Sequence, residues 1–269
     1  MIRISKADIE QAQDGNAKSL ENLVLGVQDR VYKLAVSMLA DPIAAQDATQ
    51  EILIRIVTKL STFRGDSSFE TWTYRVATNY LLTARKVIAN DPGLSFQMFA
   101  DDLLDGIADE HNAAAEDHVM LNELRLRCTM AMLLCLDSDH RAAYVLGDVL
   151  EFEHKAASEV LDITPSTYRK RLSRARASVQ NFTTRICGLA SVDAPCSCKK
   201  RLPTAMRKGC IGTSPSAGIR DAPLFSEVQA LASQTQSDLI VAKLQRATGP
   251  LKSPKDYAAE VLKLVEHLN

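Results

Sequence analysis

The stretch from residue 47 to residue 85 constrains the fold of this chain most, because it holds two helical patterns joined by a short loop. Apolar residues recur at helical spacing from Ile52 to Leu60, and the second pattern begins near Ser67 or Ser68, either of which can cap a helix. Its first turns crowd together the only tryptophan, two further aromatic residues and an arginine: Phe69, Trp72, Tyr74 and Arg75. Aromatic faces beside arginine suit the stacking of unpaired bases and the binding of phosphates. The pattern predicts a helical surface that binds single-stranded nucleic acid.

The composition favours a helical protein with two or three small domains. The chain has 269 residues, of which 46% are hydrophobic and only 5% aromatic, and alanine and leucine dominate. No run of alternating β-branched residues with hairpin turns argues for a sheet. The sequence therefore predicts an all-α fold.

Charge and hydropathy limit the possible partners. The net charge of −1 predicts no global attraction to nucleic acid, so DNA binding has to come from local basic clusters. No apolar stretch approaches the ~20 residues that span a bilayer, and the first residues lack the apolar core of a secretion signal. We expect a cytoplasmic protein without membrane insertion, whose six cysteines are reduced thiols or metal ligands.

A second helical pair lies in the sequence EFEHKAASEVLDITPSTYRKRLSRARASV. It divides into a short helix to Leu161, a turn over 162–164, and a helix that opens with Pro165. Hydroxyl groups stand at the leading end of this second helix, and five cations follow: Arg169, Lys170, Arg171, Arg174 and Arg176. This is the pattern of a helix-turn-helix, in which most cations bind phosphate and a few reach base edges. A solvated basic helix is the alternative.

The segments DATQEILIRI, FRGDSSFETWTYR and VATN, in this order and spacing, resemble region 2 of extracytoplasmic-function (ECF) sigma factors of the sigma-70 family. These are small specificity subunits of bacterial RNA polymerase, and the helix-turn-helix downstream is similar to their region 4. The resemblance implies region 2 in 1–89, a flexible linker in 90–117, region 4 in 118–185 and a small helical extension in 186–269. It also implies that the chain is not an enzyme, needs no cofactor, and binds core RNA polymerase and promoter DNA, with an anti-sigma factor as a candidate partner.

The resemblance assigns residues to each partner by position. Those implied for polymerase binding are Asp47, Gln50, Glu51 and Ile54. Those implied for the −10 element are Phe63, Arg64, Gly65, Trp72, Tyr74, Arg75 and Asn79. Those implied for the −35 element are Ser166, Thr167, Arg169, Lys170, Arg171 and Arg174. Two alternatives stay open, because Asp47 and Glu51 also fit an ordinary solvated helix face and Trp72 also fits a core anchor.

Region 4 departs from the family pattern at two points. Ala157 and Ser158 stand where an Ile-Ala pair is usual, and Asp162 stands where the turn usually has glycine. Aspartate tolerates the left-handed backbone better than most residues, so we expect the turn to form.

Four cysteines fall in the extension: Cys187, Cys196, Cys198 and Cys210. Four thiolates can hold Zn²⁺ or Cu⁺, although the single residue between Cys196 and Cys198 is short for a structural zinc site. A thiol redox switch is a second reading, in which Lys199, Lys200 and Arg201 lower the neighbouring thiol pKa. Ordinary reduced thiols are a third. Cys128 and Cys135 are expected to be small core residues.

Two amphipathic helices are expected after a connector over 212–223, at about Leu224 to Arg246 and Pro254 to Leu268. The last one carries an apolar face that either packs locally into a mini-domain or docks on the DNA-binding domains as a built-in regulator. The alternative function for the whole chain is a polymerase-independent helix-turn-helix regulator with a metal-sensing or redox-sensing tail. An enzyme built on the cysteines lacks any acid or histidine partner near them.

Overall fold

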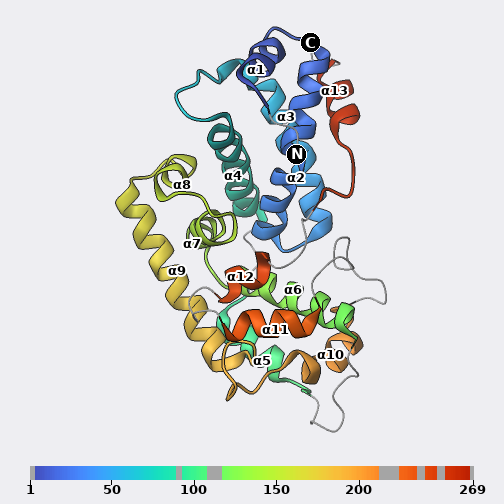
Figure 1. The fold of residues 1–269 in the computed structure, drawn as a ribbon, viewed down its shortest axis with the longest axis vertical. Coiled ribbons are helices and arrows are strands. Elements are labelled where there is room, and N and C mark those ends of the chain that lie inside the picture. The colour runs from blue at the N-terminus through green and yellow to red at the C-terminus, as the bar shows by residue number, and fades with distance from the viewer. Residues whose placement is uncertain are drawn as a thin grey trace. The chain divides into compact units, whose positions relative to one another are not determined.

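The computed structural model describes residues 4–88, 93–107, 117–211, 224–234, 240–246 and 252–266. Within these residues the regular structure is helical apart from one isolated β-bridge, so the all-α prediction is confirmed (Figure 1). The chain forms two compact units, each assembled from segments that are distant in sequence. Unit 1 comprises 1–90, 154–165 and 251–269, and unit 2 comprises 91–153 and 166–250.

Unit 1 contains the helices α1 (Lys6–Gln13), α2 (Ala17–Leu39), α3 (Pro42–Thr58), η1 (Leu60–Thr62), α4 (Phe69–Ile88), α8 (His154–Val160) and α13 (Ala258–Glu266). Helix α2 packs against α1, α3 and α4, and its apolar side chains are among the most deeply buried in the unit. Asp41 caps α3 by accepting hydrogen bonds from the backbone of its first turn, and Pro42 follows at the first helical position, where its ring suits the helix. Ser68 accepts from the backbone N–H of Thr71 and so starts α4.

The C-terminal helix α13 belongs to the core of unit 1. It lies along α2 and α3 (Figure 1), where Tyr257, Ala258 and Val261 are 1%, 2% and 0% exposed. The last residues of the predicted apolar face, Val265 and Leu268, have side chains outside the described part of the structure. Helix α13 therefore packs on α2 and α3 of unit 1 and does not form a mini-domain with the rest of the tail.

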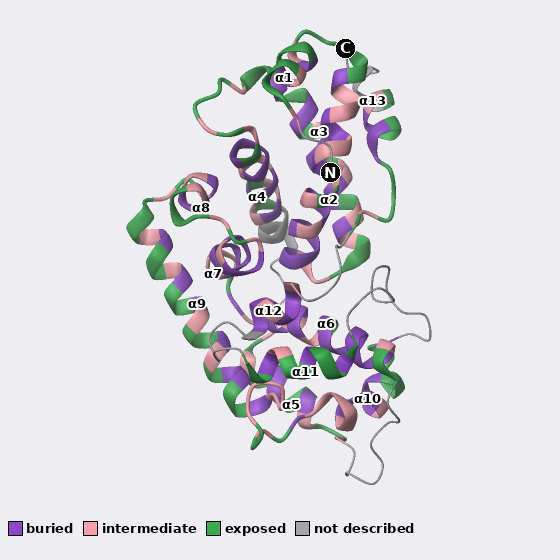
Figure 2. Cartoon of the chain, in the orientation of Figure 1, coloured by how far each residue is buried: buried purple, intermediate pink, exposed green. Residues whose placement is uncertain are grey.

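Unit 2 contains α5 (Phe96–Leu104), α6 (His118–Leu134), α7 (Ser138–Tyr144), the π-helical η3 (Val145–Val149), α9 (Pro165–Ile186), α10 (Cys198–Arg207), α11 (Phe225–Ser233) and α12 (Ile240–Arg246). Helix α6 is its centre and is buried along most of its length (Figure 2), because α5, α10, α11 and α12 all pack on it. Its C-terminal end is closed by the fully buried Arg141, whose guanidinium donates to the carbonyl oxygens of Leu133, Leu134 and Leu136 at 2.7, 2.9 and 2.6 Å. The first two of these carbonyl groups lie in the last turn of α6, where a helix end leaves them without partners.

Three expectations about the second half of the chain need correction. The segment 90–117 is not simply a flexible linker, because residues 96–104 form α5, whose Phe99 ring stacks on Phe182 at 5.5 Å. The helix expected over 224–246 is two helices, α11 and α12, with the residues between them outside the described set. The tail is not a separate mini-domain, since α10 to α12 complete the core around α6. The predicted connector over 212–223 also lies outside the described residues.

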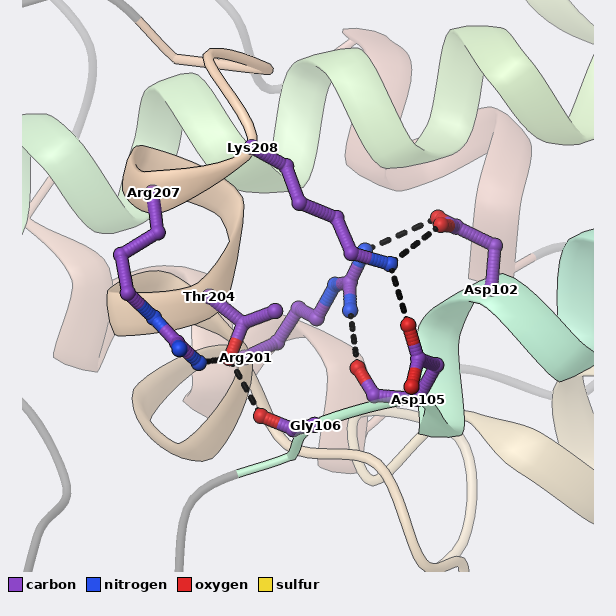
Figure 3. A network of polar contacts seen from close by, with 7 residues as sticks. All are labelled: Asp102, Asp105, Gly106, Arg201, Thr204, Arg207 and Lys208. Atoms are coloured by element: carbon purple, nitrogen blue, oxygen red, sulfur yellow. Dashed lines mark hydrogen bonds and ion pairs between the residues drawn. The ribbon is translucent and has the colours of Figure 1, made fainter.

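A polar network attaches the tail to α5 (Figure 3). Arg201 on α10 is 3% exposed and donates to the Asp102 carboxylate at 2.8 Å and to the Asp105 carbonyl oxygen at 3.1 Å. Lys208 forms ion pairs with the side-chain carboxylates of Asp102 and Asp105 at 2.9 and 2.8 Å. The Thr204 hydroxyl donates to the Gly106 carbonyl oxygen. Asp102 and Asp105, which the sequence analysis placed in a flexible linker, are therefore the partners of basic residues at α10.

Candidate nucleic-acid interface

The loop between α3 and α4 is anchored at Phe63. The side-chain amide of Gln13 donates to the carbonyl oxygens of Leu60 and Phe63, each at 2.9 Å. The Phe63 ring lies 5.4 Å from the Phe69 ring and 5.6 Å from the Trp72 ring, and the last two stack at 5.7 Å. Ring distances of this size are favourable aromatic contacts. The aromatic residues at the start of α4 thus pack against Phe63 and hold the loop in place.

The tip of this loop is exposed. Arg64 and Gly65 both face solvent, while Phe63 is half-buried. Gly65 has a φ of +80°, in the left-handed region that favours glycine, and a Cβ added there would meet nothing within 4 Å. Glycine is therefore favoured at this position by the backbone, and the space around it is open.

A hollow of about 610 Å³ lies beside the loop, formed by α3, η1 and α4. Its lining combines cations, aromatic rings and hydroxyl or amide groups: Arg55, Lys59, Thr62, Trp72, Arg75, Val76, Asn79, Tyr80 and Thr83. The Arg55 guanidinium lies 4.8 Å from the centroid of the Tyr80 ring, a cation–π contact. Of the residues predicted for the −10 element, the structure brings Trp72, Arg75 and Asn79 to this hollow.

The structure also adds residues that the sequence reasoning missed. Arg55 and Lys59 stand one turn apart on α3 and its C-terminal end, and Tyr80 follows Asn79 on α4. Their helical spacing was a usable signal, because positions four apart share a face. Arg75 also donates through Nε to the carbonyl oxygen of Glu159 at 2.9 Å.

Two residues predicted to contact DNA are largely buried. Trp72 is 9% exposed and Tyr74 is 6% exposed. Burial, followed by the nearby carboxylate of Glu70, raises the pKa of the Tyr74 hydroxyl well above its ordinary value. Tyr74 shares a face of α4 with the buried Ala77 and Leu81, so its side chain packs in the core of unit 1 and offers little surface for the predicted DNA contact. Trp72 is buried as a core anchor and also lines the hollow, so its contact with DNA stays a prediction.

The residues predicted to bind polymerase lie along α3. Asp47 and Glu51 are exposed, and Gln50 and Ile54 are half-buried. The Tyr257 hydroxyl of the tail donates to the carbonyl oxygen of Gln46 at 3.2 Å, directly beside the first of them.

The helix-turn-helix sequence forms the predicted local structure. Helix α8 ends at Val160, and Asp162 has a φ of +52°, which confirms that aspartate supplies the left-handed residue of the turn. Helix α9 then starts at Pro165 and buries Tyr168 and Leu172 within unit 2.

The basic side chains of α9 divide into two groups. Arg169, Lys170 and Arg174 are exposed, as is Ser166, whereas Thr167 is half-buried. The half-buried Arg171 forms an ion pair with Asp139 at 2.6 Å. Arg176 bonds both oxygens of Asp148, which is 4% exposed, at 2.9 and 2.6 Å. Arg171, predicted as a DNA contact, is therefore already engaged within the protein.

The cysteines are arranged differently from the prediction. Cys210 is exposed and lies apart, whereas Cys128, assigned to the core, shares one cavity with Cys187, Cys196 and Cys198. Burial raises the pKa of these four thiols, that of Cys196 to about 11, and outweighs the opposing effect of Arg201 on Cys196, so the net lowering that the redox hypothesis requires is not found. In the part of the chain that is described, no three His, Cys, Asp or Glu side chains are placed to hold a metal ion.

No described helix combines the length and the apolar content that crossing a membrane requires.

Comparison with known proteins covers the two nucleic-acid regions. The family model for Sigma-70 region 2 matches residues 23–87, and the one for Sigma-70, region 4 matches residues 126–179. The RNA polymerase sigma-H factor of Pseudomonas aeruginosa is 29% identical over 178 residues, or 64% of this chain and 89% of that protein. The ECF RNA polymerase sigma-E factor of Escherichia coli K12 is 29% identical over 178 residues, which cover 64% of this chain and 91% of its own. Among solved structures, the sigma factor RpoE of Bartonella quintana, crystallised with the anti-sigma factor NepR, aligns with a TM-score of 0.46 at 21% identity, covering 62% of this chain and 98% of that one.

The aromatic loop and the basic helix thus fall inside two matched regions that occur in the order of a sigma factor. The chain belongs to the sigma-70 family of transcription initiation factors. Within that family it is an ECF sigma factor, extended by a tail that lies beyond residue 179, where the region 4 match ends. Proteins of this family are not enzymes and normally need no cofactor.

Proposed function

We propose that this chain binds core RNA polymerase in the cytoplasm and directs it to promoters through two separate DNA-binding surfaces. The hollow beside the aromatic loop captures the opened −10 strand, and α9 binds the −35 duplex. The observation that carries the proposal is the lining of the hollow, where Arg55, Lys59 and Arg75 surround Tyr80 and Asn79. Cations beside ring faces are what sequence-tolerant binding of a single strand requires.

The two halves of the hollow have different proposed roles. Lys59 and Arg55 on the α3 side bind phosphates, and the exposed Asn79 offers a donor and an acceptor to a base edge. Extruding a base costs a few kcal/mol, and stacking returns about 1–3 kcal/mol per base. Stacking therefore offsets the cost only when phosphate contacts hold the strand. Arg64 at the exposed loop tip adds a further cation.

At the −35 element the exposed residues carry the proposed contacts. Ser166 lies at the leading end of α9, where backbone N–H groups also favour phosphate, and Arg169, Lys170 and Arg174 follow it. Arg171 is assigned to the Asp139 ion pair instead.

Run-off transcription with purified core polymerase on a promoter library tests this function. We expect defined start sites, and we expect Lys59→Ala and Asn79→Ala to reduce strand opening, read by permanganate reactivity, while duplex binding at −35 persists. Lys6→Ala, an exposed lysine on α1, is the matched control. Normal opening by both hollow variants would refute the assignment of the hollow. If the pure chain bound a duplex operator tightly and never joined polymerase, the polymerase-independent regulator would be the correct reading.

We further propose that α13 regulates polymerase binding by region 2. Ser253 donates from its backbone to the Asp29 carboxylate at 2.9 Å, and Tyr257 does the same to the side-chain oxygen of Gln28 at 3.0 Å. With the bond to Gln46, these contacts fix the tail across α2 and α3. The proposed polymerase-binding residue Asp47 lies at the edge of this contact, so docked α13 and polymerase compete for adjoining surface. A separate anti-sigma factor is a further proposed partner, on the basis of the family alone.

A further inference from the structure

Four thiols from three separate segments of unit 2 line a single cavity of about 90 Å³. Cys128 comes from α6, Cys187 follows the end of α9, and Cys196 and Cys198 stand at the start of α10. A volume of this size exceeds that needed by a single small guest such as water. Cys128 is far from the other three cysteines in the sequence, so it is the fold that brings the four thiols to one cavity.

The backbone fixes two of these cysteines side by side. Cys187 and Cys196 form an isolated parallel β-bridge, in which Gly188 N–H donates to the Cys196 carbonyl oxygen at 2.7 Å and Cys196 N–H donates to that of Ile186 at 3.1 Å. A Cβ at Gly188 would come within 2.9 Å of the Cys196 carbonyl oxygen, closer than real side chains approach. The glycine after Cys187 therefore permits the contact that brings the two thiols together.

The surroundings combine apolar walls with a buried positive charge. Leu124, Met132, Phe182 and Phe225 help to line the cavity. Arg125 is 1% exposed, and its Nη2 has no hydrogen-bond partner in the described structure. Its guanidinium lies close enough to Cys198 for the two groups to interact electrostatically. A buried cation with an unused donor beside thiols indicates a site for negative charge.

We propose that Cys128, Cys187, Cys196 and Cys198 bind a thiophilic d¹⁰ metal cation, Zn²⁺ or Cu⁺. Each thiol that ligates the ion releases its proton to solvent, and the resulting thiolate set carries net negative charge that Arg125 offsets. The proposal requires the four sulfurs to move closer together on binding, since among the described residues no three ligating side chains are already placed to hold an ion. The bound ion ties α6, the end of α9 and the start of α10 together. This inference is independent of the transcriptional role proposed above.

Metal analysis of the full chain, purified without oxygen, tests the site. We expect one equivalent of metal per chain, lost in Cys196→Ser and Cys128→Ser. It should be retained in Cys135→Ser and Cys210→Ser, two thiols that do not line the cavity. Titration with Zn²⁺ alone and with Cu⁺ alone, each against a competing chelator, decides which ion is held more tightly.

A second measurement uses the wild-type chain alone, so that it does not depend on whether the cysteine variants fold. Co²⁺ added to the metal-free wild-type chain should give intense sulfur-to-cobalt absorption bands of a tetrahedral site, and Zn²⁺ should abolish them. No such bands, with no metal retained after chelation of the wild type, would overturn the proposal. Equal loss of metal in the Cys135 or Cys210 variants would overturn it as well, as would a disulfide joining Cys187 and Cys196 in the anaerobically purified chain.

Discussion

Replacing Val261 by aspartate should release α13 from α2 and α3 and strengthen the binding of core polymerase. Val261 is fully buried at the centre of the docked helix. Loss of its apolar burial costs about 1.5–3 kcal/mol, and burial of an unpaired carboxylate adds at least as much again. The docked state is thus weakened by at least ~3 kcal/mol, which lowers the ratio of docked to undocked tail more than about 100-fold.

The gain in polymerase affinity has a ceiling that follows from competition. If the tail is docked in most molecules, the apparent dissociation constant exceeds the intrinsic one by the reciprocal of the undocked fraction. Val261→Asp should therefore reach the affinity of a chain that ends at residue 250 and go no further. The matched control is Ala259→Asp, which adds the same charge at an exposed position of α13.

Fluorescence titration with purified core polymerase measures the affinity, and limited proteolysis measures release of the tail. We expect Val261→Asp to increase both the cleavage of residues beyond 250 and the affinity, and Ala259→Asp to change neither. A Val261→Asp chain whose tail is cleaved readily, yet binds polymerase like the wild type, would refute the competition.

Three further predictions concern unit 2. Gly147→Ala should lower the unfolding free energy by about 1–3 kcal/mol in denaturant titrations, because the new methyl group would press on the Tyr168 hydroxyl; an unchanged midpoint would contradict this. Asp148→Asn should cost about 1–3 kcal/mol in the same assay by leaving the half-exposed Arg176 without its carboxylate, and the cost should shrink in high salt if the attraction between charges is its origin. At Asp137 burial favours the neutral acid, but hydrogen bonds from the backbone and imidazole of the first turn of α7 outweigh it, so its folded pKa is below the ordinary 3.8. The stability it provides is therefore present above that pH and lost as the pH falls through the lowered folded pKa, and calorimetry should find a flatter acid limb in Asp137→Ala.

Local sequence signals predicted the local features of this fold well. Helix starts at Asp41, Ser68 and Pro165 follow capping chemistry that acts within a few residues. The left-handed backbone at Asp162 was predictable for the same reason, because it depends on the residue type at that one position, and aspartate adopts this conformation more readily than most residues. Predictions of this kind need no knowledge of what packs on the helix.

Features that depend on distant partners were not predictable from pattern alone. Tyr74 was assigned to the −10 element by the family resemblance, but it packs with the buried residues of α4. Helix α5 was assigned to a flexible linker although its sequence, FQMFADDLL, is mostly apolar, because the partners that bury it, Phe182 and the cations of the tail, lie far along the chain. Cys128 was separated from the tail cysteines by the whole of α9, so only the fold could pair them.

The two parts of the tail differ in what they stabilise, and this decides how regulation can be tested. Helices α10 to α12 bury Leu202, Ala205 and Phe225 against α6, so a deletion that starts after Arg185 removes part of the core of unit 2. Loss of transcription in that variant would report unfolding and say nothing about control. A chain that ends at residue 250 keeps those helices and removes only α13, whose buried side chains pack on α2 and α3. If the shorter deletion raises polymerase affinity while its −35 binding and the unfolding of unit 2 stay unchanged, the effect belongs to α13 itself.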